Sequence, residues 1–414
     1  MNLLTIFTIV VVLSAALAYV NERFLHLPST VGLMILALVL SLVLQLGGIF
    51  SKEVLGLAER LVESIDFSEA LLDFMLSFLL FAGALHTDWS KLNKSRRPII
   101  TFATAGVVLS TFLAGTGVFL LLSLFKVTVP YFQCLVFGAL ISPTDPIAVL
   151  GILKKARVPE STEIKIVGES LFNDGIGVVL FITLLRITQR GLEKISLGEI
   201  GLLLLEEVAG GIILGLALGY LGFRLLKSID HYQTEVLITI GMVMGGYLLA
   251  KILQFSGPLA MVTAGILIGN KGKETAMSNV TMDYTFKFWE MVDEIMNAAL
   301  FVLIGLELLI IPFQLHFVWL GMATIVLVLL TRHSVLALVS IAFGFKSEFE
   351  PSTISIMTWG GLRGGISIAM ALIIPIEFNR SLFLTITYVI VLFSIIVQGL
   401  TIEHFIKRRL NRSA

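Results

Sequence analysis

The chain has 414 residues, of which 57% are hydrophobic and 14% charged, and its mean hydropathy is +0.98. These values exclude an ordinary water-soluble domain and are typical of a protein that crosses a bilayer several times. The formal net charge of zero gives no argument for a nucleic-acid partner, and the single cysteine, Cys134, excludes an intramolecular disulfide framework.

A helix of about 20 apolar residues crosses a bilayer, and the apolar stretches of this chain predict about thirteen such helices. We therefore expect an all-α polytopic membrane protein, with residues 1–414 forming a single integral membrane domain. The first stretch has no basic segment before it, so we expect a retained span rather than a cleaved signal. The predicted helices cover residues 3–20, 30–50, 69–86, 98–125, 130–152, 163–189, 196–226, 235–253, 257–270, 287–311, 314–343, 352–376 and 381–406.

The basic residues are distributed unevenly between the predicted helices. Loops after odd-numbered helices and the C-terminal segment carry most of them, including Lys91, Arg96 and Lys407, whereas loops after even-numbered helices carry few. Because cytoplasmic loops of membrane proteins are rich in lysine and arginine, we expect a cytoplasmic C-terminus. An odd number of helices then places the N-terminus outside.

Two of the predicted helices contain breaks. The fifth carries Ser142-Pro143-Thr144-Asp145-Pro146, in which two prolines flank an acid, and the twelfth carries Gly360-Gly361-Leu362-Arg363-Gly364-Gly365. Proline removes a backbone donor and glycine weakens a helix, so both helices are predicted to unwind there. Irregular backbone at membrane depth is tolerated only when it is buried in protein or lines a cavity.

The breaks occupy corresponding positions in two halves of the chain, a pattern that indicates inverted repeats and the binding site of a secondary transporter. We predict a first repeat over residues 1–189 (helices 1–6), a linking helix over 196–226 and a second repeat over 235–406 (helices 8–13).

The sixth predicted helix carries polar groups at a depth where hydrocarbon is expected. Glu169 and Asn173 are four residues apart, as are Ser170 and Asp174, so they lie on adjacent stripes of one helical face. Ionisable groups inside a membrane are costly and usually handle an ion or a proton. This face is therefore the predicted functional centre.

A hard monovalent cation prefers oxygen ligands. The Asp174 carboxylate, the Ser170 hydroxyl and an unwound carbonyl near Thr144 supply three of them, and the sequence has no cysteine or histidine cluster to favour another metal. The same carboxylate can bind a proton in place of the cation. We therefore predict exchange of a monovalent cation for a proton without a cofactor, and these residues by themselves leave Na+, Li+ and K+ as alternatives.

Two rival functions use the same residues differently. A passive cation channel also needs polar groups and broken helices, but channels use several weak sites along a pore, whereas this chain concentrates its acids in one place. An intramembrane enzyme would use Ser170 as nucleophile and His333 as base, but the acids around Ser170 oppose a developing oxyanion. We expect a transporter and not an enzyme.

Four segments together resemble the prokaryotic NhaP-type members of the sodium/proton exchanger family, in order and spacing over nearly the whole chain. These segments are residues 142–146, Gly168-Glu169-Ser170-Leu171-Phe172-Asn173-Asp174-Gly175, Phe301-Val302-Leu303-Ile304-Gly305-Leu306-Glu307-Leu308 and Trp359-Gly360-Gly361-Leu362-Arg363-Gly364. The resemblance implies a homodimer in a prokaryotic plasma membrane, with a dimerisation domain and a six-helix core around crossed broken helices. It also implies electroneutral exchange of one Na+ or Li+ for one proton by an elevator-like movement of the core.

Roles for single residues also follow from the resemblance. It makes Asp174 the carboxylate shared by cation and proton, with Ser170 and the Thr144 backbone as sodium ligands. Asp145 and Glu169 would surround the site, and Asn173 would support it. The resemblance further suggests Arg363 as the buried countercharge of Glu169, and Arg332 as a structural ion-pair partner in the core.

Several other positions have weaker signals. Asn297 is predicted to bond across helices, and Glu307 to reach the membrane interface. Glu206 and Glu207 are expected either to form an acidic funnel or simply to be solvated. Gly211, Gly215 and Gly219 form a small-residue stripe that serves packing within one protomer or a dimer interface.

Overall fold

The computed structural model of the chain describes residues 3–47, 56, 70–145, 158–191, 197–309, 315–346 and 348–410. Every regular element in these ranges is a helix, which confirms the predicted all-α fold. By length and composition, eight helices within the described ranges can cross a membrane. Two shorter apolar helices, Leu76–Leu85 and Tyr131–Ile141, accompany them.

Helices are labelled α, and short π- or 3₁₀-helical turns are labelled η. The first half contains α1 (Leu3–Val20), η1 (Asn21–Leu25), α2 (Ser29–Gly47), η2 (Ala70–Met75), α5 (Leu76–Leu85), α6 (Trp89–Lys94), α7 (Arg96–Thr101), η3 (Phe102–Gly106), α8 (Val107–Leu124), α9 (Tyr131–Ile141) and α11 (Glu160–Arg190). The second half contains α12 (Leu197–Lys227), α13 (Tyr232–Leu253), α14 (Gly257–Leu267), η5 (Ile268–Gly272), α15 (Lys273–Thr275), α16 (Asn279–Glu307), α17 (Leu315–Ala342), α18 (Pro351–Trp359), α19 (Gly365–Ile373), η6 (Ile376–Phe378), α20 (Arg380–Leu392), η7 (Phe393–Gln398) and α21 (Gly399–Leu410).

The predicted breaks are present on the described residues. α9 ends at Ile141, and the chain continues without helical structure to Asp145. Pro146 and the remainder of the predicted fifth helix lie outside the described residues. In the second half, residues 360–364 separate α18 from α19, as the glycines predicted.

One helix begins well before its predicted start. We expected residues 287–311 to be helical, but α16 begins at Asn279. Ser278 caps it: the Ser278 hydroxyl accepts from the Thr281 backbone N–H at 3.3 Å, and the Thr281 hydroxyl accepts from the Ser278 N–H at 3.1 Å. This reciprocal cap satisfies the first amides of a polar helical turn that apolar content alone does not reveal.

Three apolar clusters hold the helices together. The largest joins α9, α11, α16, α19 and α20, and a second joins α17, α18 and α21. A third joins α5, α12, α13, α14 and α16 around Trp289, whose indole N–H donates to the Thr239 hydroxyl at 2.9 Å. α5 contributes side chains to both the first and the third cluster, and its neighbour α11 contributes to the first. These two helices therefore lie where the two clusters meet.

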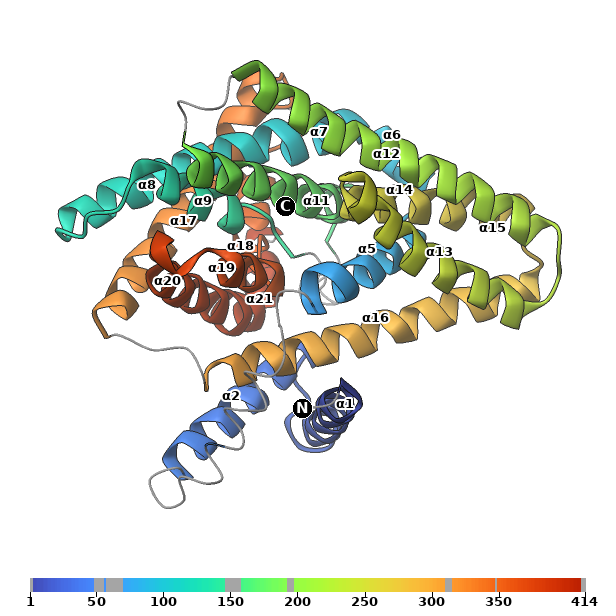
Figure 1. Cartoon of the computed structure of the whole chain (residues 1–414), viewed down its shortest axis with the longest axis horizontal. Coiled ribbons are helices and arrows are strands. Elements are labelled where there is room, and N and C mark those ends of the chain that lie inside the picture. Colours follow the sequence, from blue (N-terminus) through green and yellow to red (C-terminus); the bar gives the residue numbers. More distant parts are fainter. Residues whose placement is uncertain are drawn as a thin grey trace.

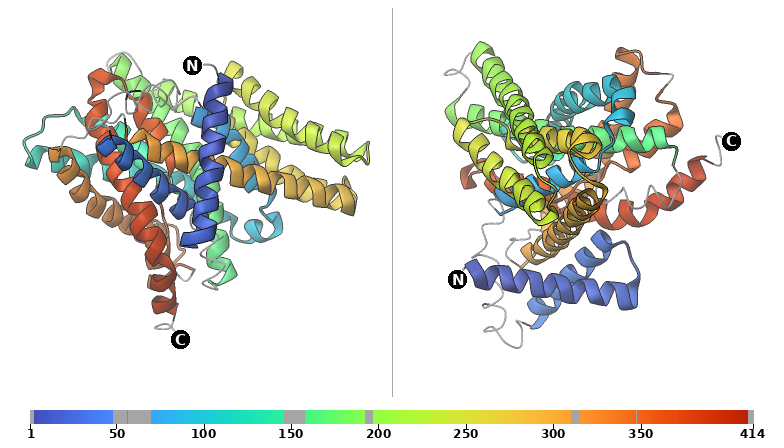
Figure 2. Two further views of the ribbon diagram at one scale, coloured as in Figure 1. Left: turned by 90° about the horizontal axis from the view of Figure 1, so that it is seen from below. Right: turned by 90° about the vertical axis from the view of Figure 1, so that its right-hand side faces the viewer.

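Figure 1 shows α12, α13 and α14 on the right and α8, α9, α17 and α20 on the left, with α11 and α5 between them. α16 runs along the lower side, and α1 and α2 pack against it. Viewed from the right-hand side, α1 and α2 form the lower edge of the molecule (Figure 2). The predicted site residues Thr144, Asp174 and Arg363, which lie after α9, on α11 and between α18 and α19, are buried within this helical assembly.

The glycine stripe of α12 serves packing within one protomer. A Cβ at Gly211 would lie 2.6 Å from the Ser256 carbonyl oxygen, and one at Gly219 would lie 3.1 Å from Ala264 Cα. A Cβ at Gly215, between them, would clash with the Ala260 carbonyl oxygen. These glycines therefore let α12 and α14 approach closely, which resolves the alternative left open by the sequence.

Candidate functional site

The two interrupted helices meet at their breaks. The Asp145 backbone N–H donates to the Leu362 carbonyl at 2.8 Å, so the two unwound segments are in direct contact. A Cβ on Gly364 would lie 2.9 Å from the Cβ of Asp145, closer than two carbon atoms can pack. Glycine is therefore required at this position by the close approach of the two segments.

Arg363 bridges from one break to the other. Its guanidinium Nη1 donates to the carbonyl oxygens of Ser142 and Pro143, each at 2.6 Å, and the residue is only 3% exposed. The end of α9 leaves these carbonyls without helical partners, and charged donors form the stronger hydrogen bonds. Arg363 thus satisfies the backbone groups that the break in α9 releases.

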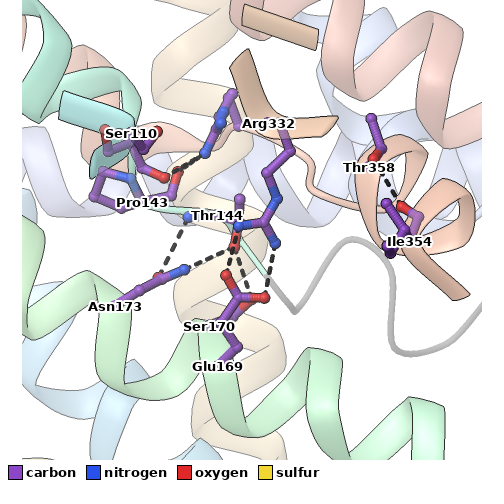
Figure 3. A network of polar contacts seen from close by, with 11 residues as sticks. Ser110, Pro143, Thr144, Glu169, Ser170, Asn173, Arg332, Ile354 and Thr358 are labelled. Atoms are coloured by element: carbon purple, nitrogen blue, oxygen red, sulfur yellow. Dashed lines mark hydrogen bonds and ion pairs between the residues drawn. The ribbon is translucent and has the colours of Figure 1, made fainter. Parts of the chain in front are cut away.

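The ion pair of Glu169 differs from one of our two predictions. Arg332 of α17 donates to both carboxylate oxygens of Glu169, at 2.5 and 2.7 Å, and both side chains are buried (Figure 3). The prediction that Arg332 is an ion-pair partner in the core is confirmed. The prediction that Arg363 is the countercharge of Glu169 is wrong, because Arg363 donates to backbone carbonyls and Arg332 reaches Glu169 with a matching two-pronged geometry.

Three predicted site residues form one hydrogen-bonded group around Thr144. The Thr144 hydroxyl lies 2.9 Å from the Ser170 hydroxyl and accepts from the Asn173 amide, also at 2.9 Å. The Asn173 carbonyl oxygen in turn accepts from the Thr144 backbone N–H at 3.3 Å (Figure 3). α11 therefore fixes both the side chain and the backbone of the unwound segment.

Asp174 follows Ser170 by one helical turn and faces a small cavity. It is 4% exposed, and its Oδ1 atom has no hydrogen-bond partner among the described residues. The cavity has a volume of about 60 Å³, and its polar lining includes Asp145 and Asp174. Thr144 and Ser170 do not line it but are bonded to each other. A buried carboxylate oxygen without a partner is costly and indicates a group that binds something at this point.

A larger cavity of about 540 Å³ adjoins the first, since Gly83 and Leu171 line both. Its wall also contains His86 and Lys91, and Lys91 forms an ion pair with Glu160 at the start of α11. Acidic residues dominate its polar lining: Asp88, Glu160, Glu163, Glu290, Asp293 and Glu294.

The acids that α16 contributes to this cavity are not among the residues predicted from the sequence. Glu290, Asp293 and Glu294 have the spacing of a single helical face, which was a usable signal. The predicted helix begins at residue 287, only just before these three acids, so their shared face was not recognised.

Three weaker predictions are corrected. Glu207 pairs with Arg186 of α11 at 3.1 Å and is therefore not freely solvated, whereas Glu206 is exposed, in agreement with the solvation alternative. Asn297 donates to the Asp293 carbonyl within its own helix at 2.8 Å instead of bonding across helices. Glu307 is only 3% exposed and does not reach an interface in the described protomer, because the end of α16 packs against α2.

Ser170 and His333 have separate surroundings. Ser170 is bonded to Thr144, whereas the His333 ring is exposed and lies 3.3 Å from the Thr358 hydroxyl. A nucleophile must lie within hydrogen-bonding reach of its base. Ser170 and His333 therefore do not form the nucleophile–base pair that an intramembrane enzyme would need.

Comparison with known proteins agrees with these features. The family described as "Sodium/hydrogen exchanger, transmembrane" matches residues 10–408 of this chain. The chain is 46% identical to the Na+/H+ antiporter NhaP of Pseudomonas aeruginosa, over 96% of this chain and 95% of that protein. It is 32% identical to the Na+/H+ antiporter NhaH of Halobacillus dabanensis, over 93% of each.

A solved structure has the same fold. The sodium proton antiporter MjNhaP1 from Methanocaldococcus jannaschii superposes with a TM-score of 0.75 over 100% of this chain and 99% of that one, at 20% sequence identity. The matched family is one of transporters, so the expectation of a transporter and not an enzyme is confirmed. With a match over nearly its whole length, the chain belongs to the sodium/hydrogen exchanger family.

Proposed function

We propose that the protein exchanges one Na+ or Li+ for one proton across the membrane, with Asp174 binding the two in turn. The observation that carries this proposal is the buried Asp174 carboxylate, which lines a cavity beside two helix breaks and whose Oδ1 has no hydrogen-bond partner in the part of the chain that the structure describes. A carboxylate in such a place is stabilised either by a proton or by a cation. Mutual exclusion of the two ligands gives obligatory exchange.

The remaining cation ligands come from the residues next to Asp174. The hydroxyls of Ser170 and Thr144 lie 2.9 Å apart, and when Thr144 donates to Ser170 each hydroxyl oxygen keeps one lone pair for a cation. The backbone of Thr144, without helical structure, offers a further oxygen, and water completes the shell. Asp145 and Glu169 act from the surroundings of the site, while Asn173 holds Thr144 in position.

The charges around the site favour electroneutral exchange. Arg332 neutralises Glu169, and Arg363 offsets one of the two carboxylates of Asp145 and Asp174. One negative charge then remains, and a single monovalent cation or a single proton neutralises it. Asn173 is an amide and carries no second proton.

Larger-scale features of the proposal rest on the sequence and on the relatives. We propose crossed broken helices between an inverted first repeat (residues 1–189) and second repeat (235–406), and the bond from Asp145 to Leu362 supports this pairing. We also propose a homodimer in a prokaryotic plasma membrane whose core moves like an elevator. With the C-terminus cytoplasmic, the acidic cavity beside Lys91 opens toward the cytoplasm.

The test is transport by the purified protein in liposomes. An imposed Na+ or Li+ gradient should drive proton movement in the opposite direction without generating a membrane potential. Parallel assays with K+ distinguish a potassium/proton antiporter of the same mechanism. A passive channel would instead conduct cations without obligatory proton movement, and that result would overturn the proposal.

A further inference from the structure

Two residues separate the small cavity at Asp174 from the large acidic cavity. Gly83 of α5 and Leu171 of α11 line both cavities, and the helices that carry them are in contact. A cation that travels from the acidic cavity to Asp174 therefore passes between these two residues. Neither residue offers a polar side chain to it.

The gap between them is open on the side of α5. A Cβ built on Gly83 would lie 3.8 Å from Leu171 Cδ1, with no other heavy atom beyond its own helix and its neighbours within 4 Å. That distance is ordinary van der Waals contact, so a methyl group at this position fits without strain. Any atoms beyond the Cβ would project into the passage.

Leu171 is placed to act together with Asp174. It is 4% exposed and lies three residues before Asp174, so the two side chains occupy neighbouring positions on one face of α11. Gly83 lies on a different helix, one packed into the cluster around Trp289. A displacement of α11 relative to α5 therefore changes the width of the passage.

The two cavities differ in chemistry on either side of this passage. Acidic side chains of the large cavity attract cations and raise their local concentration. A narrow apolar constriction opposes the passage of a hydrated ion because the constriction itself tends to be empty of water. The residues at the constriction therefore control how easily a cation exchanges its water for the oxygens at Asp174.

We propose that Gly83 and Leu171 form an apolar constriction, here called the threshold, on the path to Asp174. This threshold sets the rate at which a monovalent cation reaches Asp174 and the largest cation that can pass. The proposal rests on the function proposed above, and it assigns to this pair a role in access and not in coordination. Glycine at position 83 keeps the threshold open, and the leucine makes it narrow.

The experiment varies side-chain size at the threshold in the full-length protein in liposomes. Gly83→Ala should slow sodium-driven proton movement a few-fold, and Gly83→Leu should slow it by about tenfold or more, as expected when a constriction is closed to hydrated ions. The control is Gly241→Leu on the exposed surface of α13, where a Cβ meets no atom within 4 Å; it should exchange at the wild-type rate.

A second substitution tests whether the two residues share one gap. Leu171→Ala, combined with Gly83→Leu, should restore exchange to within about threefold of the wild type, because the volume added at one wall is removed at the other. Each variant is first checked for a wild-type thermal unfolding temperature. The proposal is overturned if folded Gly83→Leu exchanges at the wild-type rate. It is also overturned if the double variant Gly83→Leu/Leu171→Ala is as slow as Gly83→Leu alone.

Chemical labelling gives a readout that does not depend on a bulky substitution. A polar thiol reagent should block exchange by Gly83→Cys, whereas the wild type should be unaffected because Cys134 is fully buried. Labelling without any loss of exchange would contradict the proposal. A different result would show that the proposed function itself is wrong. In that case Asp174→Asn would still exchange sodium for protons, whatever residue stands at position 83.

Discussion

Arg332 holds both carboxylate oxygens of Glu169, at 2.5 and 2.7 Å, although the two residues are 163 positions apart. The pair joins α17 to the polar face of α11, one turn before Asn173. Because both side chains are buried, water cannot take the place of either partner if the other charge is left alone. The pair thus ties the second half of the chain to the helix that carries Asp174.

Arg332→Gln should therefore destabilise the protein strongly. Breaking a buried pair on one side costs about 3–5 kcal/mol, because an uncompensated charge is left behind. The double variant Arg332→Gln/Glu169→Gln should recover part of this loss, since it leaves no unpaired charge. Thermal unfolding of the purified variants measures both effects, and equal loss in the single and double variants would argue against a coupled pair.

Asp174→Asn should abolish exchange while leaving the unfolding temperature close to that of the wild type. The amide has nearly the same size but neither takes up a proton nor supplies a negative charge. Asp283→Asn is the matched control, because Asp283 is an exposed carboxylate that pairs with Lys287 one turn away. Substantial sodium-driven proton movement by Asp174→Asn would rule out the proposed mechanism.

Asn173→Asp should not by itself make transport electrogenic. Arg332 and Arg363 still compensate the neighbouring acids, and the new carboxylate loses the amide donor that binds the Thr144 hydroxyl. We expect slower exchange with an unchanged one-to-one ratio. The measurement is a voltage-sensitive dye in liposomes with a sodium gradient; a potential generated by this variant would contradict the expectation.

Acidification should weaken sodium binding without lowering the rate at saturating sodium. Below the pH at which the Asp174 carboxylate is half protonated, each unit of acidification should raise the sodium concentration for half-maximal rate about tenfold, because proton and cation compete. In alkaline solution the proton-loaded form becomes scarce and the rate should fall. Initial rates over a grid of pH and sodium test this; a sodium affinity that is independent of pH would exclude direct competition.

Much of the fold could be predicted because its signals are local. Apolar length located the helices, and Pro143 and the glycines around Arg363 predicted both breaks from backbone chemistry alone. The grouping of Ser170 with Asn173 on one face followed from helical periodicity. These inferences need no knowledge of how distant helices pack.

The partner of Glu169 needed that knowledge. Arg332 and Arg363 are both buried arginines in the second half, and only the rotation and depth of α17 relative to α11 decide which one meets Glu169. The contribution of Asp293 to the large cavity has a different, local origin, since its helix begins at a side-chain cap and not at an apolar boundary.

The guanidinium of Arg363, fixed on the carbonyls of Ser142 and Pro143, places a buried positive charge beside the unwound segment that carries Asp145. With Asp145 and Asp174 ionised, the net charge left for a guest is a single negative one. A calcium or magnesium ion would reverse that charge and leave a net positive charge buried in protein, which is strongly unfavourable. We therefore expect the proposed site to discriminate by valence through the backbone contacts of one arginine, independently of the width of any opening.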